Sequence, residues 1–136
     1  MKLEFNFTQS GVLPYRRKDN KIEVLLISSI RRKKWIIPKG YVEFNLSHFE
    51  SAKKEAFEEA GVFGENETIE LGSFKVHKNI GTCLIQVFSM EVNKILDDYP
   101  DKERRRRKWF SIEEAVQNVE IPELKQIITT LPLKIG

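Results

Sequence analysis

The chain has 136 residues, of which 40% are hydrophobic, and 23 basic against 20 acidic residues give a formal net charge of +3 at pH 7. This length and composition predict a single domain over residues 1–136 and exclude a fully disordered chain. No apolar stretch approaches the ~20 residues that cross a bilayer, and one cysteine, Cys83, cannot form an internal disulfide, so we expect a soluble, cytoplasmic protein with no membrane partner.

The first part of the chain alternates short strands with polar turns. Alternating and short apolar runs predict strands at residues 3–8, 11–15, 22–28 and 35–37. Asp19 and Asn20 form the turn before the third strand. After Pro38 we expect a polar loop from Lys39 to about Ser47.

A helix follows, and both of its ends are marked in the sequence. Ser47 with Glu50 three residues later is the capping-box pattern. Gly61 suits the left-handed position that follows a last helical turn. Phe49 and alanines at helical spacing give this helix an apolar stripe that can pack closely on a sheet.

The second part of the chain predicts more strands and two short helices. Strands are expected at residues 69–77, 81–92 and 109–110, with a long exposed loop at 93–107. Ser111 and Glu114 repeat the capping box and start a helix to about Asn118, and Pro122 fits the first turn of a last helix. These elements indicate a mixed α/β sandwich.

Three glutamates on the first helix carry the strongest chemical signal. Glu55, Glu58 and Glu59 stand at i, i+3 and i+4, so their side chains meet on one patch of the helix. Taken alone, they are a solvated acidic surface. A bound Mg²⁺ or Mn²⁺ would explain the clustering of like charges, because these ions prefer oxygen ligands.

The segment GYVEFNLSHFESAKKEAFEEAGV, from Gly40 to Val62, resembles the signature of the Nudix hydrolase family, G-x5-E-x7-R-E-U-x-E-E-x-G-U with U a bulky aliphatic residue. The resemblance implies an α/β/α sandwich with a mixed sheet. It also implies a pyrophosphohydrolase whose Mg²⁺ or Mn²⁺ is held by Glu55, Glu58, Glu59 and Gly40.

The chain departs from this signature at three positions. Leu46 stands where the family has a glutamate, Lys54 where it has an arginine, and Ala56 where it has a bulky aliphatic residue. Lys54 keeps the positive charge that the resemblance assigns to orienting the glutamates, without the planar fork of arginine. Leu46 can be neither a ligand nor a base, so we expect metal binding to persist with a slower chemical step.

The flanking segments resemble the diadenosine polyphosphate hydrolases and the diphosphoinositol polyphosphate phosphohydrolases. In several relatives a glutamate six residues before a tryptophan binds metal or activates water, and Glu103 stands six residues before Trp109. The alternative is that Glu103 is a solvated charge beside the arginines that follow it. The general base is therefore open between Glu59 and Glu103.

Basic residues cluster in runs that can bind the phosphates of a substrate. The predicted phosphate-binding residues are Lys39, Arg31, Lys34, Arg105 and Arg107. The alternative is that these runs are solvated loops. General nucleic-acid binding is not expected, because the net charge is modest and no strand interleaves aromatic and basic residues.

These observations predict metal-dependent hydrolysis of a phosphoanhydride in a highly charged small molecule, a diadenosine polyphosphate or a diphosphoinositol polyphosphate. One alternative is a catalytically silent polyphosphate-binding module, and another is a hydrolase of nucleotide sugars, nucleoside triphosphates or RNA 5′ ends. A monomer and a homodimer are equally compatible with the sequence.

Overall fold

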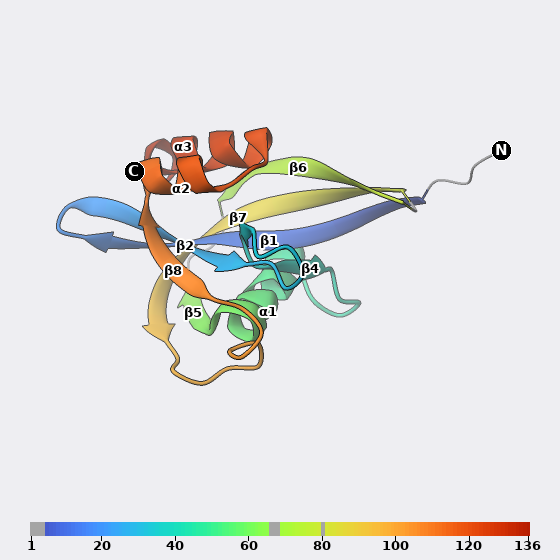
Figure 1. Ribbon diagram of the computed structural model, residues 1–136, viewed down its shortest axis with the longest axis horizontal. Coiled ribbons are helices and arrows are strands. Elements are labelled where there is room, and N and C mark those ends of the chain that lie inside the picture. Colours follow the sequence, from blue (N-terminus) through green and yellow to red (C-terminus); the bar gives the residue numbers. More distant parts are fainter. Residues whose placement is uncertain (1–4, 66–68, 80) are drawn as a thin grey trace.

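The computed structural model describes residues 5–65, 69–79 and 81–136, and within them a mixed eight-stranded sheet is the middle layer of the molecule. One helix covers one face of this sheet and two helices cover the other (Figure 1). This arrangement confirms the predicted α/β/α sandwich with a mixed sheet. No helix in the described part of the chain is long and apolar enough to span a bilayer.

The elements follow in the order β1 (Phe5–Lys18), β2 (Lys21–Ser28), β3 (Trp35–Ile36), β4 (Lys39–Tyr41), α1 (His48–Ala60), β5 (Val62–Glu65), β6 (Glu70–Lys78), β7 (Gly81–Ile95), β8 (Arg107–Ser111), α2 (Ile112–Asn118) and α3 (Pro122–Ile135). The long strands β1 and β7 run parallel to each other at the centre of the sheet. The other strand pairs are antiparallel.

The N-terminal region forms one long strand where two were expected. Gln9 and Ser10, which separate the predicted strands, are buried and pair with β4 on one side and β7 on the other. The ladder therefore continues through these two polar residues, because pairing on both edges outweighs their low strand propensity. The start of the first predicted strand, residues 3 and 4, lies outside the described residues.

Two short strands replace parts of expected loops. Lys39–Tyr41 pairs antiparallel with β1 as β4, so the prediction that the polar loop begins at Lys39 was wrong. Val62–Glu65 forms β5 against the end of β7, which extends to Ile95 and shortens the next loop to residues 96–106. Both strands are too short to show a periodic pattern in the sequence. Their formation depends on pairing with the neighbouring strand.

The helix α1 has the ends that the sequence predicts. The Ser47 hydroxyl accepts from the Glu50 N–H and the Glu50 carboxylate accepts from the Ser47 N–H, each at 3.0 Å. Gly61 follows the helix at φ 66°, where a side chain would be strained. These two caps set the length of α1 and the direction of its side chains.

Hydrophobic residues form two clusters, one on each face of the sheet. Alternation along β1 sends Val12 to the cluster under α1 and Leu13 to the cluster under α2 and α3. The alanines Ala52, Ala56 and Ala60 are fully buried, so α1 lies close to the sheet. This close packing brings the opposite edge of α1 to β4.

Candidate functional site

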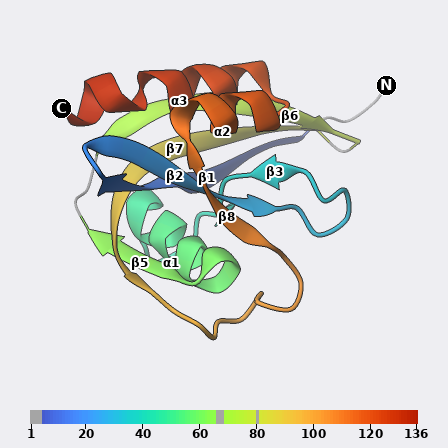
Figure 2. The same ribbon diagram turned by 60° about the vertical axis from the view of Figure 1, so that its left-hand side comes forward.

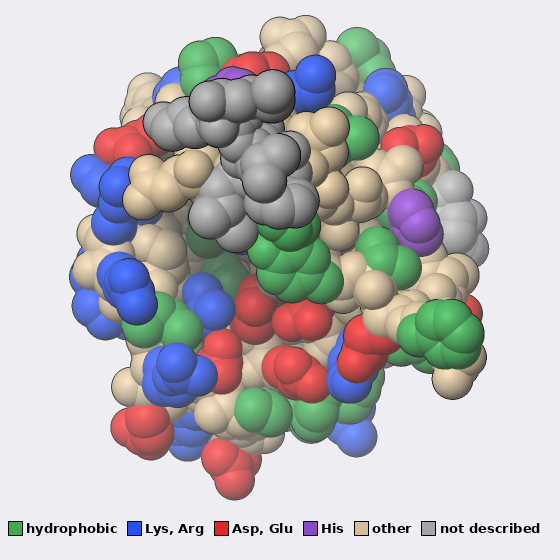
Figure 3. All heavy atoms as spheres, turned by 90° about the vertical axis from the view of Figure 1, so that its right-hand side faces the viewer, with side chains coloured by type: hydrophobic (Ala, Val, Ile, Leu, Met, Phe, Trp, Pro, Cys, Tyr) green, Lys and Arg blue, Asp and Glu red, His purple; other side chains and the backbone are tan. Residues whose placement is uncertain are grey.

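The three glutamates of α1 lie beside its buried alanine stripe, and we call Glu55, Glu58 and Glu59 the acidic face. Each is half-buried, whereas the other acidic residue of the helix, Glu50, is exposed and caps the first turn. Figure 3 shows acidic side chains gathered beside a hollow, with lysine and arginine along one side. The predicted convergence of the three carboxyl groups on one patch is therefore present.

Gly40 allows the acidic face to lie against β4. A Cβ atom at this position would stand 2.4 Å from the carboxyl carbon of Glu55, well inside van der Waals contact. The bare backbone of Gly40 therefore makes room for the Glu55 carboxylate. This close approach explains why β4 carries a glycine here.

Glu59 is the most firmly held of the three. Its Oε1 accepts a hydrogen bond from the Lys39 N–H at 3.0 Å, and its Oε2 lies 3.4 Å from Nη2 of Arg105. Burial raises the pKa of Glu59, and the charge of Arg105 and the Lys39 N–H lower it in part. One contact on each oxygen fixes the plane of this carboxylate.

Arg105 pairs with the acidic face through Glu59, and its role in binding phosphate stays a prediction. Its Nε donates to Asp101 at 2.9 Å, and Nη1 donates to the Ser28 carbonyl at 3.4 Å. The Asp101 N–H also donates to the Glu58 carbonyl at 2.9 Å, which ties the 96–106 loop to the end of α1. Figure 2 shows this loop running past α1 on its way from β7 to β8.

Glu55 has the most perturbed carboxyl group. Its pKa is raised to about 7, first by burial and then by the nearby carboxylates of Glu59, Glu58 and Glu43, in that order of size. A carboxyl group with this pKa is partly protonated near neutrality. A cation placed among these groups would lower the pKa and release the proton.

Glu43 is part of the site although the sequence analysis missed it. Its two carboxylate oxygens accept from the Lys54 ammonium at 2.8 and 2.9 Å, and its N–H donates to the Ser51 hydroxyl at 3.0 Å. Lys54 also lies 4.0 Å from Glu58. Its only signal in the sequence is an acidic residue between Gly40 and α1, and the path of that segment in the fold brings it to Lys54.

Lys39 is a buried cation at the edge of this site. Burial lowers the pKa of its ammonium group, and the charge of Glu59 raises it in part. Its strand partner is Gly11 on β1, so its side chain lies on the face of the sheet that α2 and α3 cover. The backbone N–H of Lys39 thus contacts the acidic face at Glu59, while its side chain starts on the other face of the sheet.

The Arg107 side chain binds backbone carbonyls at the end of α1. Its guanidinium donates to the carbonyls of Ala60 at 2.8 Å and Leu96 at 2.7 Å and lies over the Tyr99 ring. The contact with Ala60 satisfies a carbonyl of the last turn of α1, and the contact with Leu96 links that turn to the residue that follows β7. The geometry assigns Arg107 to holding the helix end, and its predicted role in binding phosphate has no support here.

Among the described residues, the remaining predicted site residues form no hydrogen bond or ion pair with the acidic face. Lys34 pairs with Glu120 at 3.0 Å, on the α2 and α3 side, and Arg31 is exposed in the same β2–β3 loop. Glu103 is exposed, and among the described residues it has no ion pair or hydrogen-bond partner of its side chain. The acidic residue of its loop that contacts the site is Asp101.

The donor set of the acidic face fits a hard divalent cation. Carboxylates are the oxygen ligands that Mg²⁺ and Mn²⁺ prefer, and the bare Gly40 backbone lets the Glu55 carboxylate lie against β4. Over residues 5–65, 69–79 and 81–136, no three acidic, imidazole or thiol groups already converge into a coordination shell. Binding an ion therefore calls for rotation of the side chains that Lys54 and Arg105 now contact.

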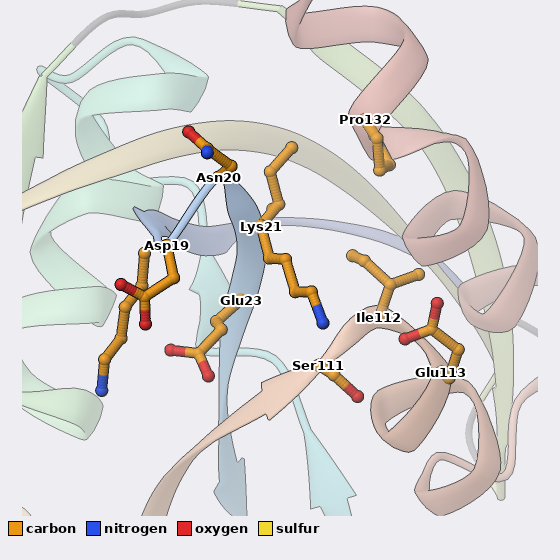
Figure 4. Close-up of a pocket in the computed structure, with 10 residues that line it drawn as sticks. Asp19, Asn20, Lys21, Glu23, Ser111, Ile112, Glu113 and Pro132 are labelled. Carbon is orange, nitrogen blue, oxygen red and sulfur yellow. The ribbon is translucent and has the colours of Figure 1, made fainter.

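A large cavity lies elsewhere. It measures about 750 Å³ and lies between the β1–β2 turn, the start of α2 and Pro132 of α3 (Figure 4). Its charged lining residues are Lys18, Asp19, Lys21, Glu23 and Glu113, so acidic groups outnumber basic ones. A cavity with this balance is a poor site for a polyphosphate.

Comparisons with known proteins agree with the geometry. The model of the NUDIX domain matches residues 8–131. Nudix hydrolase 12, mitochondrial, of Arabidopsis thaliana is 33% identical over 129 residues, which are 79% of this chain and 64% of the relative. Diphosphoinositol polyphosphate phosphohydrolase 3-beta of Bos taurus is 36% identical over 104 residues, 74% of this chain and 62% of the relative.

Solved structures show the same fold. The crystal structure of C. elegans Ap4A hydrolase superposes with a TM-score of 0.79 at 20% identity and covers 97% of this chain and 100% of that chain. The chain spans less than two thirds of the length of the two sequence relatives above. The domain is therefore shared, and the relatives contain further sequence.

Proposed function

The chain belongs to the Nudix family, and from this premise we propose that it hydrolyses a phosphoanhydride bond of a highly charged small molecule with the help of Mg²⁺ or Mn²⁺. The observation that carries the proposal is the acidic face held against Gly40 and Lys39 by Arg105. The substrate class is a dinucleoside polyphosphate or a diphosphoinositol polyphosphate.

Glu55, Glu58 and Glu59, with the Gly40 carbonyl, would hold the ion. When bound, the ion supplies charge neutralisation on the phosphate oxygens and lowers the pKa of a water molecule. The pKa of Glu55, about 7, is raised first by burial and then by the neighbouring carboxylates, which repel its charged form. Because the three carboxylates lie close together, binding of a divalent cation among them is favoured.

The chain's own residues position the substrate and a water molecule. The Lys39 ammonium is half-buried and its pKa responds to the charge of Glu59, and we assign it to binding a phosphate oxygen of the substrate. Each oxygen of Glu59 keeps a lone pair free after its contact with Lys39 or Arg105, and that lone pair has a fixed direction. Glu59 is thus the better-placed acceptor for a water proton, and Glu103 is the alternative.

Names of relatives support the substrate class. One relative is named a diphosphoinositol polyphosphate phosphohydrolase and one structural neighbour an Ap4A hydrolase. Lys54 and Leu46 stand where the family signature has arginine and glutamate, which leaves a silent binding module as a second candidate. Turnover separates the two candidates.

The test is product analysis with Mg²⁺ or Mn²⁺ on diadenosine polyphosphates, a diphosphoinositol polyphosphate, ADP-ribose, nucleoside triphosphates and 5′-triphosphorylated RNA. We expect metal-dependent cleavage of one of the first two classes and a loss of at least ~100-fold in Glu58→Gln. The control is Glu65→Gln, an exposed glutamate on β5, which should keep wild-type turnover. Equal turnover in both variants would contradict the proposal.

A further inference from the structure

A buried hydroxyl group without a hydrogen-bond partner lies next to the acidic face. Ser10, near the middle of β1, has no exposed surface. In the part of the chain that the structure describes, no group forms a hydrogen bond with its Oγ. A buried hydroxyl that lacks a partner destabilises the folded state, so the presence of a serine at this position calls for an explanation.

Strand register places the Ser10 side chain on the α1 side of the sheet. Val12, two residues further along β1, belongs to the hydrophobic cluster under α1, and alternation along the strand puts Ser10 on the same face. The antiparallel partner of Ser10 is Gly40 on β4. The Ser10 Cβ atom therefore lies about 5 Å from the point that a Cβ atom of Gly40 would occupy.

The carboxyl group of Glu55 lies at that point. A Cβ atom added to Gly40 would overlap this carboxyl group. Within residues 5–65, 69–79 and 81–136, the Glu55 carboxylate forms no hydrogen bond and no ion pair. A hydroxyl donor and a carboxylate acceptor, neither with a partner, thus lie beside the same bare glycine.

The other polar neighbour of Ser10 is already engaged. Gln86 on β7 is the parallel partner of Ser10. Its Oε1 contacts Nδ1 of His48, and its Nε2 donates to Glu70 Oε1 at 3.4 Å. Since the amide of Gln86 has a contact on both of its polar atoms, Glu55 is the better partner for the Ser10 hydroxyl.

We propose that Ser10 is a positioning residue of the metal site, whose hydroxyl donates a hydrogen bond to the Glu55 carboxylate when that carboxylate binds a divalent cation. The inference rests on the proposed function, because it takes the acidic face as the metal site. Lys54 does not hold Glu55, since its ammonium donates to both oxygens of Glu43. A donor in a buried position gives Glu55 the direction that Lys54 does not supply.

This role predicts opposite effects of Ser10→Ala in the two states of the protein. Without a metal ion, the substitution removes a buried hydroxyl that has no partner, so Tm should rise by a few degrees. With a metal ion, it removes a hydrogen bond to a charged ligand, so Mg²⁺ should bind about tenfold more weakly. A serine that only fills space would leave the Mg²⁺ affinity unchanged.

The measurements are thermal unfolding in EDTA and calorimetric titration with Mg²⁺, and the matched control is Ser89→Ala. Ser89 is also a buried serine of the sheet, but it is the strand partner of Leu13, which belongs to the cluster under α2 and α3. Ser89→Ala should keep the Mg²⁺ affinity within about twofold of the wild type, because the change is on the opposite face of the sheet.

The outcomes separate this role from the proposed function. A higher Tm in EDTA together with weaker Mg²⁺ binding, in Ser10→Ala and not in Ser89→Ala, would support it. Equal Mg²⁺ affinity of Ser10→Ala and the wild type, with metal-dependent turnover present, would overturn the role of Ser10 and retain the hydrolase. A lower Tm of Ser10→Ala in EDTA would also overturn it, because the hydroxyl would then have a partner without the metal. No Mg²⁺ binding and no metal-dependent turnover by the wild type would contradict the proposed function and this role with it.

Discussion

Replacing Glu55 by glutamine should stabilise the metal-free protein, although Glu55 belongs to the acidic face. Burial and neighbouring carboxylates raise the pKa of Glu55 from an ordinary value of 4.5 to about 7 in the folded protein. A carboxyl group with a raised folded-state pKa adds stability below pH 4.5, and this stability is lost as the pH rises through 7. Glutamine has no charge to lose, so the variant escapes that loss.

The size of the effect follows from the two pKa values. Their difference corresponds to about 3 kcal/mol at 1.36 kcal/mol per pKa unit. Because Glu55 is only half-buried, solvent screening reduces the expected gain to about 1 kcal/mol. For a domain of this length, such a gain raises Tm by roughly 4 °C.

The assay is thermal unfolding in EDTA at pH 4.5 and pH 8, for the wild type, Glu55→Gln and the exposed control Glu65→Gln. We expect Glu55→Gln to exceed the wild type in Tm at pH 8 and to match it at pH 4.5. With Mg²⁺ at pH 8 the wild type should gain stability and the variant should not. Equal Tm values at pH 8 in EDTA would refute the argument that the acidic face is strained without a cation.

Three further substitutions test the site. Gly40→Ala should displace the Glu55 carboxyl and weaken Mg²⁺ binding at least tenfold by calorimetry, with a Tm change of a few degrees, and unchanged affinity would show that Gly40 is not needed for the close approach. Arg107→Met should lower the free energy of unfolding by about 2 kcal/mol and leave KM unchanged. A raised KM at unchanged Tm would restore its predicted role in binding phosphate. Glu43→Gln should weaken Mg²⁺ binding by freeing Lys54 to compete for the acidic face, and adding Lys54→Met should reverse the loss. If the double variant still binds Mg²⁺ weakly, Glu43 contributes to Mg²⁺ binding directly and not through Lys54.

The helix and its glutamates could be predicted because their signals are local. The Ser47 capping box and Gly61 fix the ends of α1 within a few residues of sequence, and helical spacing then places Glu55 and Glu59 together. A match to a family signature over the same segment adds an independent constraint. These features do not depend on the rest of the fold.

The partners of the glutamates could not be predicted, because tertiary pairing sets them. Arg105 and Arg107 are neighbours in one basic run, yet one pairs with Glu59 and the other caps the end of α1. Asp101, and not Glu103, reaches the site, since the path of the loop decides which side chain turns inward. Sequence gives the charge of these residues but not their direction.

Short strands are the other part of the structure that could not be predicted from the sequence. β4 has three residues and follows a proline, so no periodic pattern marks it, yet it supplies both the Lys39 N–H and the bare Gly40 backbone to the acidic face. Its position comes from antiparallel pairing with β1. The half of the site built by β4 therefore depends on a long-range contact.

The most direct test of the central claim is turnover of diadenosine tetraphosphate with Mg²⁺ by the wild type, Glu58→Gln and Glu65→Gln, with each variant shown to be folded. The account predicts nucleotide products that need the metal, remain in Glu65→Gln and fall at least ~100-fold in Glu58→Gln. Products formed equally well in EDTA, or by Glu58→Gln at the wild-type rate, would contradict it.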